Sequence, residues 1–224
     1  MPQAANVWHT VALVLTVDAM NKRTFLLRGA ALLAAGPVTA LAQSKPHSKP
    51  RKPAPAPVAG PALLTVTGAI SRSNRGATDP ALDPLFNKLG IHFDKAWTLS
   101  WPELAAMPSN EIRTTLAWDG KVHTLQGPYL AQLLATAGAA TRDGTKVLLR
   151  GLDGTNASIS LGDLRKYRYI VATHMDGQPL ALGGLGPLWA VYAADQFAEI
   201  TARPLAERYL NCPYALFHIE VQTG

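Results

Sequence analysis

Reactive chemistry in this sequence can come from only a few side chains: one cysteine and several histidines. The single cysteine, Cys212, excludes an internal disulfide and any zinc site that needs several thiolates. Four histidines are dispersed along the chain without an H-x-x-x-H spacing: His92, His123, His174 and His218. We expect them to be surface or structurally hydrogen-bonded residues rather than metal ligands. No G-x-S-x-G motif is present to place a nucleophilic serine on a sharp turn.

Aspartates and tryptophans form the other two candidate groups. Asp119, Asp153 and Asp176 each precede glycine, which is typical of turn residues. The tryptophans are open to two interpretations, because they can line an apolar pocket or simply pack in the core, which is the commoner role. The four concerned are Trp97, Trp101, Trp118 and Trp189.

The distribution of charge argues against nucleic acid as a partner. The 224-residue chain has a net charge of +6, with +2 in residues 1–42 and +4 in residues 43–60. The remainder, 61–224, has 14 basic and 14 acidic residues and is therefore neutral. A neutral body offers no general attraction to a phosphate backbone, so we expect no nucleic-acid binding.

The N-terminal segment has the pattern of an export signal. Residues 20–42 begin with a basic stretch containing Lys22, Arg23 and Arg28, and continue with a short apolar stretch that ends at Ala40-Leu41-Ala42. The apolar stretch is too short for the ~20 residues of a spanning helix. We therefore predict no transmembrane span, a general secretory signal cleaved near Ala42, and a periplasmic or secreted protein. An uncleaved anchor or a buried helix is the alternative.

Two further segments flank this signal. Residues 1–19 precede the basic stretch, so the hypothesis is that translation begins at Met20 and that 1–19 are an annotation overhang. Residues 43–61 contain six prolines and four basic residues, which favours an extended linker. A spacer is the simpler role for this linker, and contact with an anionic surface is the other.

Residues 62–224 show alternating apolar patterns separated by Asp-Gly turns, with few helical stretches. We predict strands at 62–70, 97–99, 111–118, 121–125, 147–152, 157–161, 169–175, 188–192 and 216–221. We predict short helices at 84–89, 101–106, 128–137 and 164–167, the second of them started by a Ser100–Glu103 capping box. This mixture predicts an α+β fold with a mixed, curled sheet. Glycine-rich nucleotide-binding motifs are absent, so we expect neither NAD nor a nucleoside triphosphate, and no haem.

The order of motifs resembles one known family. LTVTGAI, WTLSWPELAAMP, TTLAWDG, GPYLAQLLATAG, VLLRGLDG, LRKYRYIVATHMDGQPLALGGLGPLWAVY and LFHIEV follow one another between Leu63 and Val221. The chain in this range is similar to the molybdopterin-binding domain of the sulfite oxidase fold, especially to its small exported members. The resemblance implies an exported oxidoreductase-type domain with a molybdopterin cofactor.

Several positions depart from what this resemblance implies. In catalytic members, the strand matching TTLAW ends in a cysteine that binds molybdenum; here Trp118 stands there, before Asp119. Trp189 stands where those members tend to carry arginine, and Tyr214 lies where they carry a Lys-Trp pair. Tryptophan has no basic lone pair for a metal. Trp118, Asp119, Trp189 and Tyr214 are therefore the cleft positions by resemblance, and the sequence predicts no metal ligand.

Two functions remain open from the sequence. One is a periplasmic oxidoreductase that binds molybdopterin. The other, favoured by these departures, is a non-catalytic module that uses the family cleft to bind a small ligand or a protein partner. The oligomeric state is not predicted.

Overall fold

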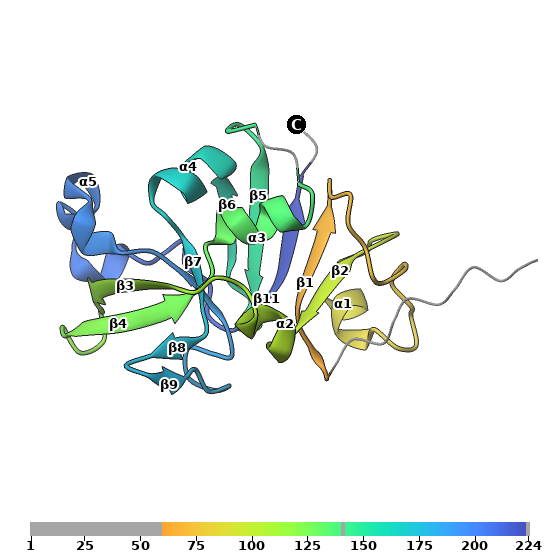
Figure 1. The fold of residues 1–224 in the computed structure, drawn as a ribbon, viewed down its shortest axis with the longest axis horizontal. Coiled ribbons are helices and arrows are strands. Elements are labelled where there is room, and N and C mark those ends of the chain that lie inside the picture. Colours follow the sequence, from red (N-terminus) through yellow and green to blue (C-terminus); the bar gives the residue numbers. More distant parts are fainter. Residues whose placement is uncertain (1–59, 140–141, 223–224) are drawn as a thin grey trace, which may run out of the picture. The chain divides into compact units, whose positions relative to one another are not determined.

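The computed structural model describes residues 60–139 and 142–222 of the chain (Figure 1). The predicted overhang at 1–19, the signal peptide at 20–42 and nearly all of the linker at 43–61 lie outside the described residues. Among the residues that are described, no helix has the length and apolar character needed to cross a membrane.

The larger sheet has five strands in the order β2-β1-β11-β5-β6. Its strands are β1 (Ala62–Gly68), β2 (Trp97–Ser100), β5 (Lys146–Gly151), β6 (Asn156–Ser160) and β11 (Leu216–Val221). Strands β1 and β11 are parallel, with Thr65 beside His218, whereas every other pair in this sheet is antiparallel. The sheet therefore joins the first and last strands of the described chain at its centre and is mixed, as predicted.

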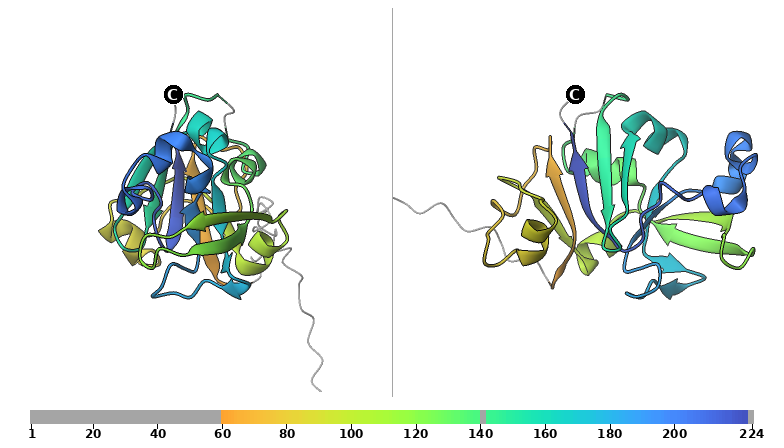
Figure 2. Two further views of the ribbon diagram at one scale, coloured as in Figure 1. Left: turned by 90° about the vertical axis from the view of Figure 1, so that its left-hand side faces the viewer. Right: turned by 180° about the vertical axis from the view of Figure 1, so that it is seen from behind.

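A second, four-stranded sheet has the order β3-β4-β8-β9. It consists of β3 (Asn110–Thr115), β4 (Val122–Gly127), β8 (His174–Met175) and β9 (Gln178–Pro179). A two-stranded ribbon of β7 (Ile170–Ala172) and β10 (Trp189–Val191) lies between the two sheets in Figure 1. The right-hand view in Figure 2 shows the same separation of β3 and β4 from the larger sheet.

The helices are short and cover the sheets without alternating regularly with the strands. They are α1 (Pro84–Lys88), α2 (Trp101–Ala105), α3 (Leu130–Thr136), α4 (Leu161–Lys166) and α5 (Ala198–Thr201), with 3-10 turns η1 (Ala194–Gln196) and η2 (Leu205–Glu207). The predicted capping box of α2 is present, because Glu103 Oε2 accepts hydrogen bonds from Ser100 N and Ser100 Oγ, both at 2.7 Å. Helix α3 buries Leu130, Leu133 and Leu134.

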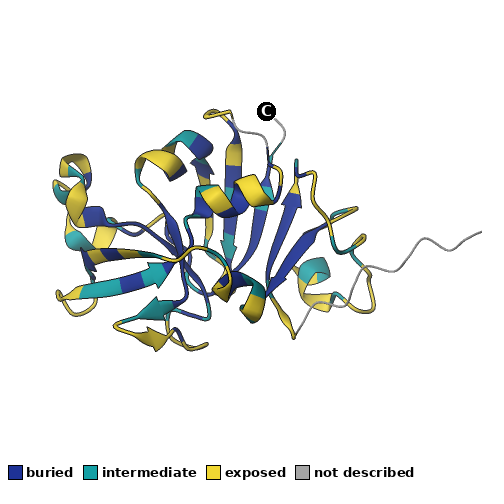
Figure 3. Ribbon diagram, viewed as in Figure 1, coloured by how far each residue is buried: buried dark blue, intermediate teal, exposed yellow. Residues whose placement is uncertain are grey.

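The hydrophobic core lies along the central strands of the larger sheet and the β7–β10 ribbon (Figure 3). Strand β11 is buried along almost its whole length, and β7 and β10 are buried throughout. Burial on both faces explains why these segments read as apolar runs of β-branched and aromatic residues. The predicted α+β class with mixed sheets and short helices is confirmed.

Two local predictions are wrong. The strand predicted at 111–118 ends at Thr115, and the turn is a longer loop rather than the dipeptide Asp119-Gly120. A helical turn closes this loop, in which Gly120 N donates to Leu116 O at 3.0 Å. The strand predicted at 169–175 is divided at Thr173, because β7 pairs with β10 while β8 pairs with β4. Strand β9, helix α5 and the 3-10 turns were not predicted.

Candidate functional site

The loop between β3 and β4 places Trp118 at the surface. Because Gly120 takes a positive φ of 67°, the backbone coils through one helical turn before β4 begins. Trp118 therefore lies in the loop after β3 and not in the strand, and it is 48% exposed.

Trp118 rests on two other aromatic rings. Its ring centroid lies 5.8 Å from that of Trp189 and 6.1 Å from that of Tyr214, and the last two rings are 5.6 Å apart. The structure therefore brings together three of the four residues assigned to the site from the sequence. We call Trp118, Trp189 and Tyr214 the aromatic cluster.

Trp189 anchors this cluster in the core. It lies on β10 with no exposed surface, and its indole Nε1 donates a hydrogen bond of 3.0 Å to the carbonyl oxygen of Cys212. A buried indole needs such a partner for its N–H. This bond also ties β10 to the segment that carries Cys212 and Tyr214 toward β11.

The end of β3, from which the Trp118 loop starts, is held by polar contacts. Asp195 Oδ2 accepts hydrogen bonds from Thr115 N at 2.6 Å and Thr115 Oγ1 at 2.8 Å. Tyr209 OH donates to Thr115 O at 2.7 Å and shares a 2.7 Å hydrogen bond with Thr114 Oγ1. Tyr209 also packs on Trp189, with ring centroids 5.9 Å apart. The loop is thus fixed to the same residues that support the aromatic cluster.

Asp119, the fourth assigned residue, takes part in a different group. His123 Nε2 lies 2.9 Å from Asp119 Oδ2, and His123 Nδ1 lies 2.6 Å from Asp176 Oδ2. Both ring nitrogens face carboxylates, so both must carry a proton to donate, which describes a charged imidazolium. The hydrogen bonds to Asp176 and Asp119 raise the pKa of His123. Hydrogen bonds from Lys121 N and His123 lower the pKa of Asp119, and those from Thr124 N and His123 lower that of Asp176.

Sequence reasoning treated these three residues separately and missed their grouping. The i, i+4 spacing of Asp119 and His123 across one hairpin was a usable signal. The approach of Asp176 depends on β8 pairing with β4, which no local pattern reveals.

The donor set does not fit a molybdenum–thiolate centre. Cys212 is buried, with 2% of its surface exposed, and burial raises the pKa of its thiol, which keeps it protonated. Trp118 offers only a donor N–H, and the N–H of Trp189 is already donated to the carbonyl oxygen of Cys212. No cluster of three or more His, Cys, Asp or Glu side chains suited to a metal occurs within residues 60–139 and 142–222.

The other candidate histidines have structural surroundings. Buried His218 accepts a hydrogen bond of 2.8 Å from Arg150 at Nδ1, so its proton is on Nε2 and is donated to Thr67 Oγ1 at 2.9 Å. Burial, with help from the charge of Arg150, lowers the pKa of His218 to about 3. His174 bonds Thr173 Oγ1 and packs near Trp101, whereas His92 is exposed.

Comparisons with known proteins concern the fold. No family model matches the chain, and no curated protein matches it. Among solved structures, the chain is similar to the sulfane dehydrogenase SoxCD from Paracoccus pantotrophus, with a TM-score of 0.47 and 12% identity. The match covers 71% of this chain and 37% of that chain, so this chain spans little more than a third of its neighbour.

Proposed function

We propose that residues 62–224 form a non-catalytic binding module that uses the aromatic cluster to hold a small ligand with a flat apolar surface. The observation that carries this proposal is the position of Trp118. Its ring is half exposed while it rests on Trp189, which has no exposed surface. An aromatic ring held in place by a buried neighbour offers contact area to a ligand and loses little conformational entropy when the ligand binds.

The residues at the cluster favour binding over redox catalysis. By the motif resemblance, Trp118 takes the place of the molybdenum thiolate and Trp189 that of an arginine. The remaining thiol, Cys212, is buried with its carbonyl bound to Trp189. A soft thiolate ligand is what molybdenum chemistry would require here.

Metal analysis of the purified full chain separates this proposal from a molybdopterin oxidoreductase. We expect no molybdenum above background. Molybdenum near one atom per chain would overturn the proposal. In a second arm, Trp118→Cys is expected to give no oxidase activity after expression with a cofactor supply, because the cationic positions at Trp189 and Tyr214 are also changed. Gain of activity in that variant would contradict the binding module.

Export is part of the same proposal. The basic and apolar pattern of residues 20–42 supports secretion and cleavage before Gln43, which would place the module in the periplasm or outside the cell. N-terminal sequencing of protein recovered from the periplasm or culture medium is expected to begin at Gln43. Recovery of residues 1–19 on that protein would contradict both the cleavage and the start at Met20.

A further inference from the structure

Two residues after the end of helix α4, Arg168 occupies the C′ position, where glycine is the favoured residue. Arg168 N donates to Arg165 O and Tyr169 N donates to Leu164 O, both at 3.1 Å, which is the hydrogen-bond pattern of a Schellman motif. Arg168 has a positive φ of 54°. A side chain in this left-handed conformation is strained relative to the right-handed one, so the backbone alone would favour glycine at this position.

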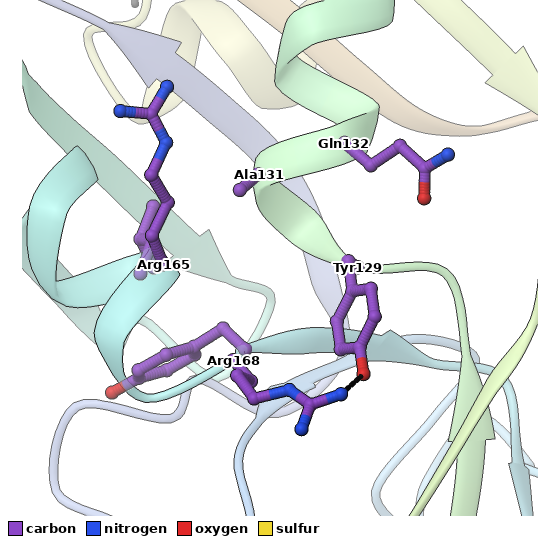
Figure 4. A pocket seen from close by; sticks show the side chains of 7 residues that line it. Tyr129, Ala131, Gln132, Arg165 and Arg168 are labelled. Carbon is purple, nitrogen blue, oxygen red and sulfur yellow. Dashed lines mark hydrogen bonds between the residues drawn. The ribbon is translucent and has the colours of Figure 1, made fainter. Parts of the chain in front are cut away.

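The side chain of Arg168 borders a cavity of about 240 Å³ between the end of α4 and the start of α3 (Figure 4). Leu164 and Tyr169, which are both buried, contribute its apolar floor, and Ala131 lies on the α3 side. The volume corresponds to roughly eight waters at about 30 Å³ each. No residue of the aromatic cluster lines it.

The rim of this cavity is basic. Arg168 donates a hydrogen bond to Tyr129 OH and lies over the Tyr129 ring, with 5.3 Å from guanidinium carbon to ring centroid. Across residues 60–139 and 142–222 no carboxylate forms an ion pair with Arg168. Arg165 on the same rim is paired with Asp143 at 2.5 Å. Glu111 lines an adjoining hollow that Arg168 also borders, and its carboxylate accepts a hydrogen bond of 3.2 Å from Gln126 rather than from Arg168.

We propose that this cavity binds a small carboxylate with an apolar body, the carboxylate on Arg168 and the body on Leu164 and Tyr169. A guanidinium without a carboxylate partner can hold a ligand carboxylate through two parallel hydrogen bonds. The apolar floor favours a ring or short alkyl chain over a bare anion such as phosphate. A volume of about 240 Å³ suits a ligand with one small ring or a short chain.

Benzoate is a suitable probe, with benzamide as its neutral counterpart of the same shape. In calorimetric titrations of the full chain, we expect saturable binding of benzoate and at least tenfold weaker binding of benzamide. Inorganic phosphate is expected to bind at least tenfold more weakly than benzoate. Equal binding of benzoate and benzamide, tighter binding of phosphate, or absence of benzoate binding would each overturn the proposal.

Two variants separate ligand binding from a structural role of Arg168. Arg168→Gly is expected to weaken benzoate binding at least tenfold while retaining the thermal midpoint, since glycine suits the backbone. Tyr129→Phe removes the hydroxyl partner but keeps the guanidinium, so benzoate binding is expected to remain. Arg113→Gln is the matched charge control on β3 and should bind as the unaltered chain does. Unchanged binding by Arg168→Gly, or a lowered midpoint together with loss of binding in both Arg168→Gly and Tyr129→Phe, would contradict the proposal.

Because this cavity and the aromatic cluster share no residue, the two proposals can fail separately. Loss of benzoate binding in Arg168→Gly assigns the probe to the cavity. Unchanged binding in that variant overturns the cavity proposal and leaves the aromatic cluster untouched.

Discussion

Of the two tryptophans in the aromatic cluster, Trp189 is buried in the core and Trp118 is half exposed. Replacing each with alanine should therefore lower the stability of the fold by different amounts. Trp189→Ala removes a ring with no exposed surface and is expected to destabilise the fold by about 3–5 kcal/mol. Trp118→Ala removes a ring that is 48% exposed and forgoes mainly its contacts with Trp189 and Tyr214, so about 1 kcal/mol is expected. Urea unfolding followed by circular dichroism measures both. A loss for Trp118→Ala as large as that for Trp189→Ala would show that Trp118 is a structural core residue.

A second residue-scale prediction concerns pH. Because the pKa of His123 is raised above its ordinary value of 6.5, its contribution to stability is complete below that value and is lost as pH rises through the folded-state pKa. The lowered pKa values of Asp119 and Asp176 act in the opposite sense, because their contribution is lost as pH falls through the folded values. The group of His123, Asp119 and Asp176 therefore stabilises the fold most at pH values above the folded-state pKa values of the two carboxyls and below that of His123.

His123→Gln tests this assignment. We expect the unaltered chain to lose stability as pH rises above 6.5, and the variant to show a smaller loss over the same range. An NMR titration of the His123 ring in the unaltered chain is expected to give a pKa above 6.5. A pKa at or below 6.5 would mean that the two carboxylates do not both hold the imidazolium.

The sequence could predict features of these residues that follow from local patterns, but not those that depend on contacts between distant segments. The motif resemblance assigned Trp118, Asp119, Trp189 and Tyr214 to one cleft. In the structure the rings of Trp118, Trp189 and Tyr214 lie together, whereas Asp119 is bonded to His123. The sequence could not show that Trp118 is exposed, since the alternation of 111–118 reads as a continuous strand. A helical turn closed by Gly120 overrides that alternation. Asp176 reaches His123 only through sheet pairing of distant segments.

At the scale of elements, β4 and β7 approach each other so closely that a side chain has no room between them. A Cβ added to Gly127 would lie 1.9 Å from the carbonyl oxygen of Val171, which is backbone and cannot turn away. Gly127→Ala is therefore expected to destabilise the fold by about 3 kcal/mol or more, at the upper end for overpacking.

Gly144 supplies the matched control for this substitution. A Cβ there would meet nothing within 4 Å, and its φ is not positive, so Gly144→Ala is expected to be neutral or slightly stabilising. Chemical unfolding of the two variants side by side makes the comparison. Equal effects would show that β4 and β7 are less tightly packed than the structure has them.

Elements with strong local signals were predicted well, and those defined by distant partners were not. Helix α2 carries its capping box in the sequence, and α3 carries three leucines on one face. By contrast, the division of 169–175 into β7 and β8 arises because its two halves pair with different strands. A single apolar run cannot encode a change of partner, which is a property of the tertiary structure.

At the scale of the whole molecule, the parallel pairing of β1 with β11 closes the fold. Strand β1 begins at Ala62 and β11 ends at Val221, so the first and last strands of the described chain lie side by side. This arrangement requires the full 62–221 segment before the central sheet is complete. The stability of the sheet thus rests on apolar burial along β1, β11 and β5.

The last prediction follows from that arrangement. A fragment of residues 62–222, without the linker and without added metal or cofactor, is expected to fold and to melt in one cooperative transition. The apolar core provides the driving force, and no metal-suited cluster occurs in the part of the chain that the structure describes. Differential scanning calorimetry before and after dialysis against a strong chelator should give the same midpoint. A transition that appears only after molybdopterin is supplied, or a midpoint that falls on chelation, would show that the fold depends on a bound group and would also count against the binding module.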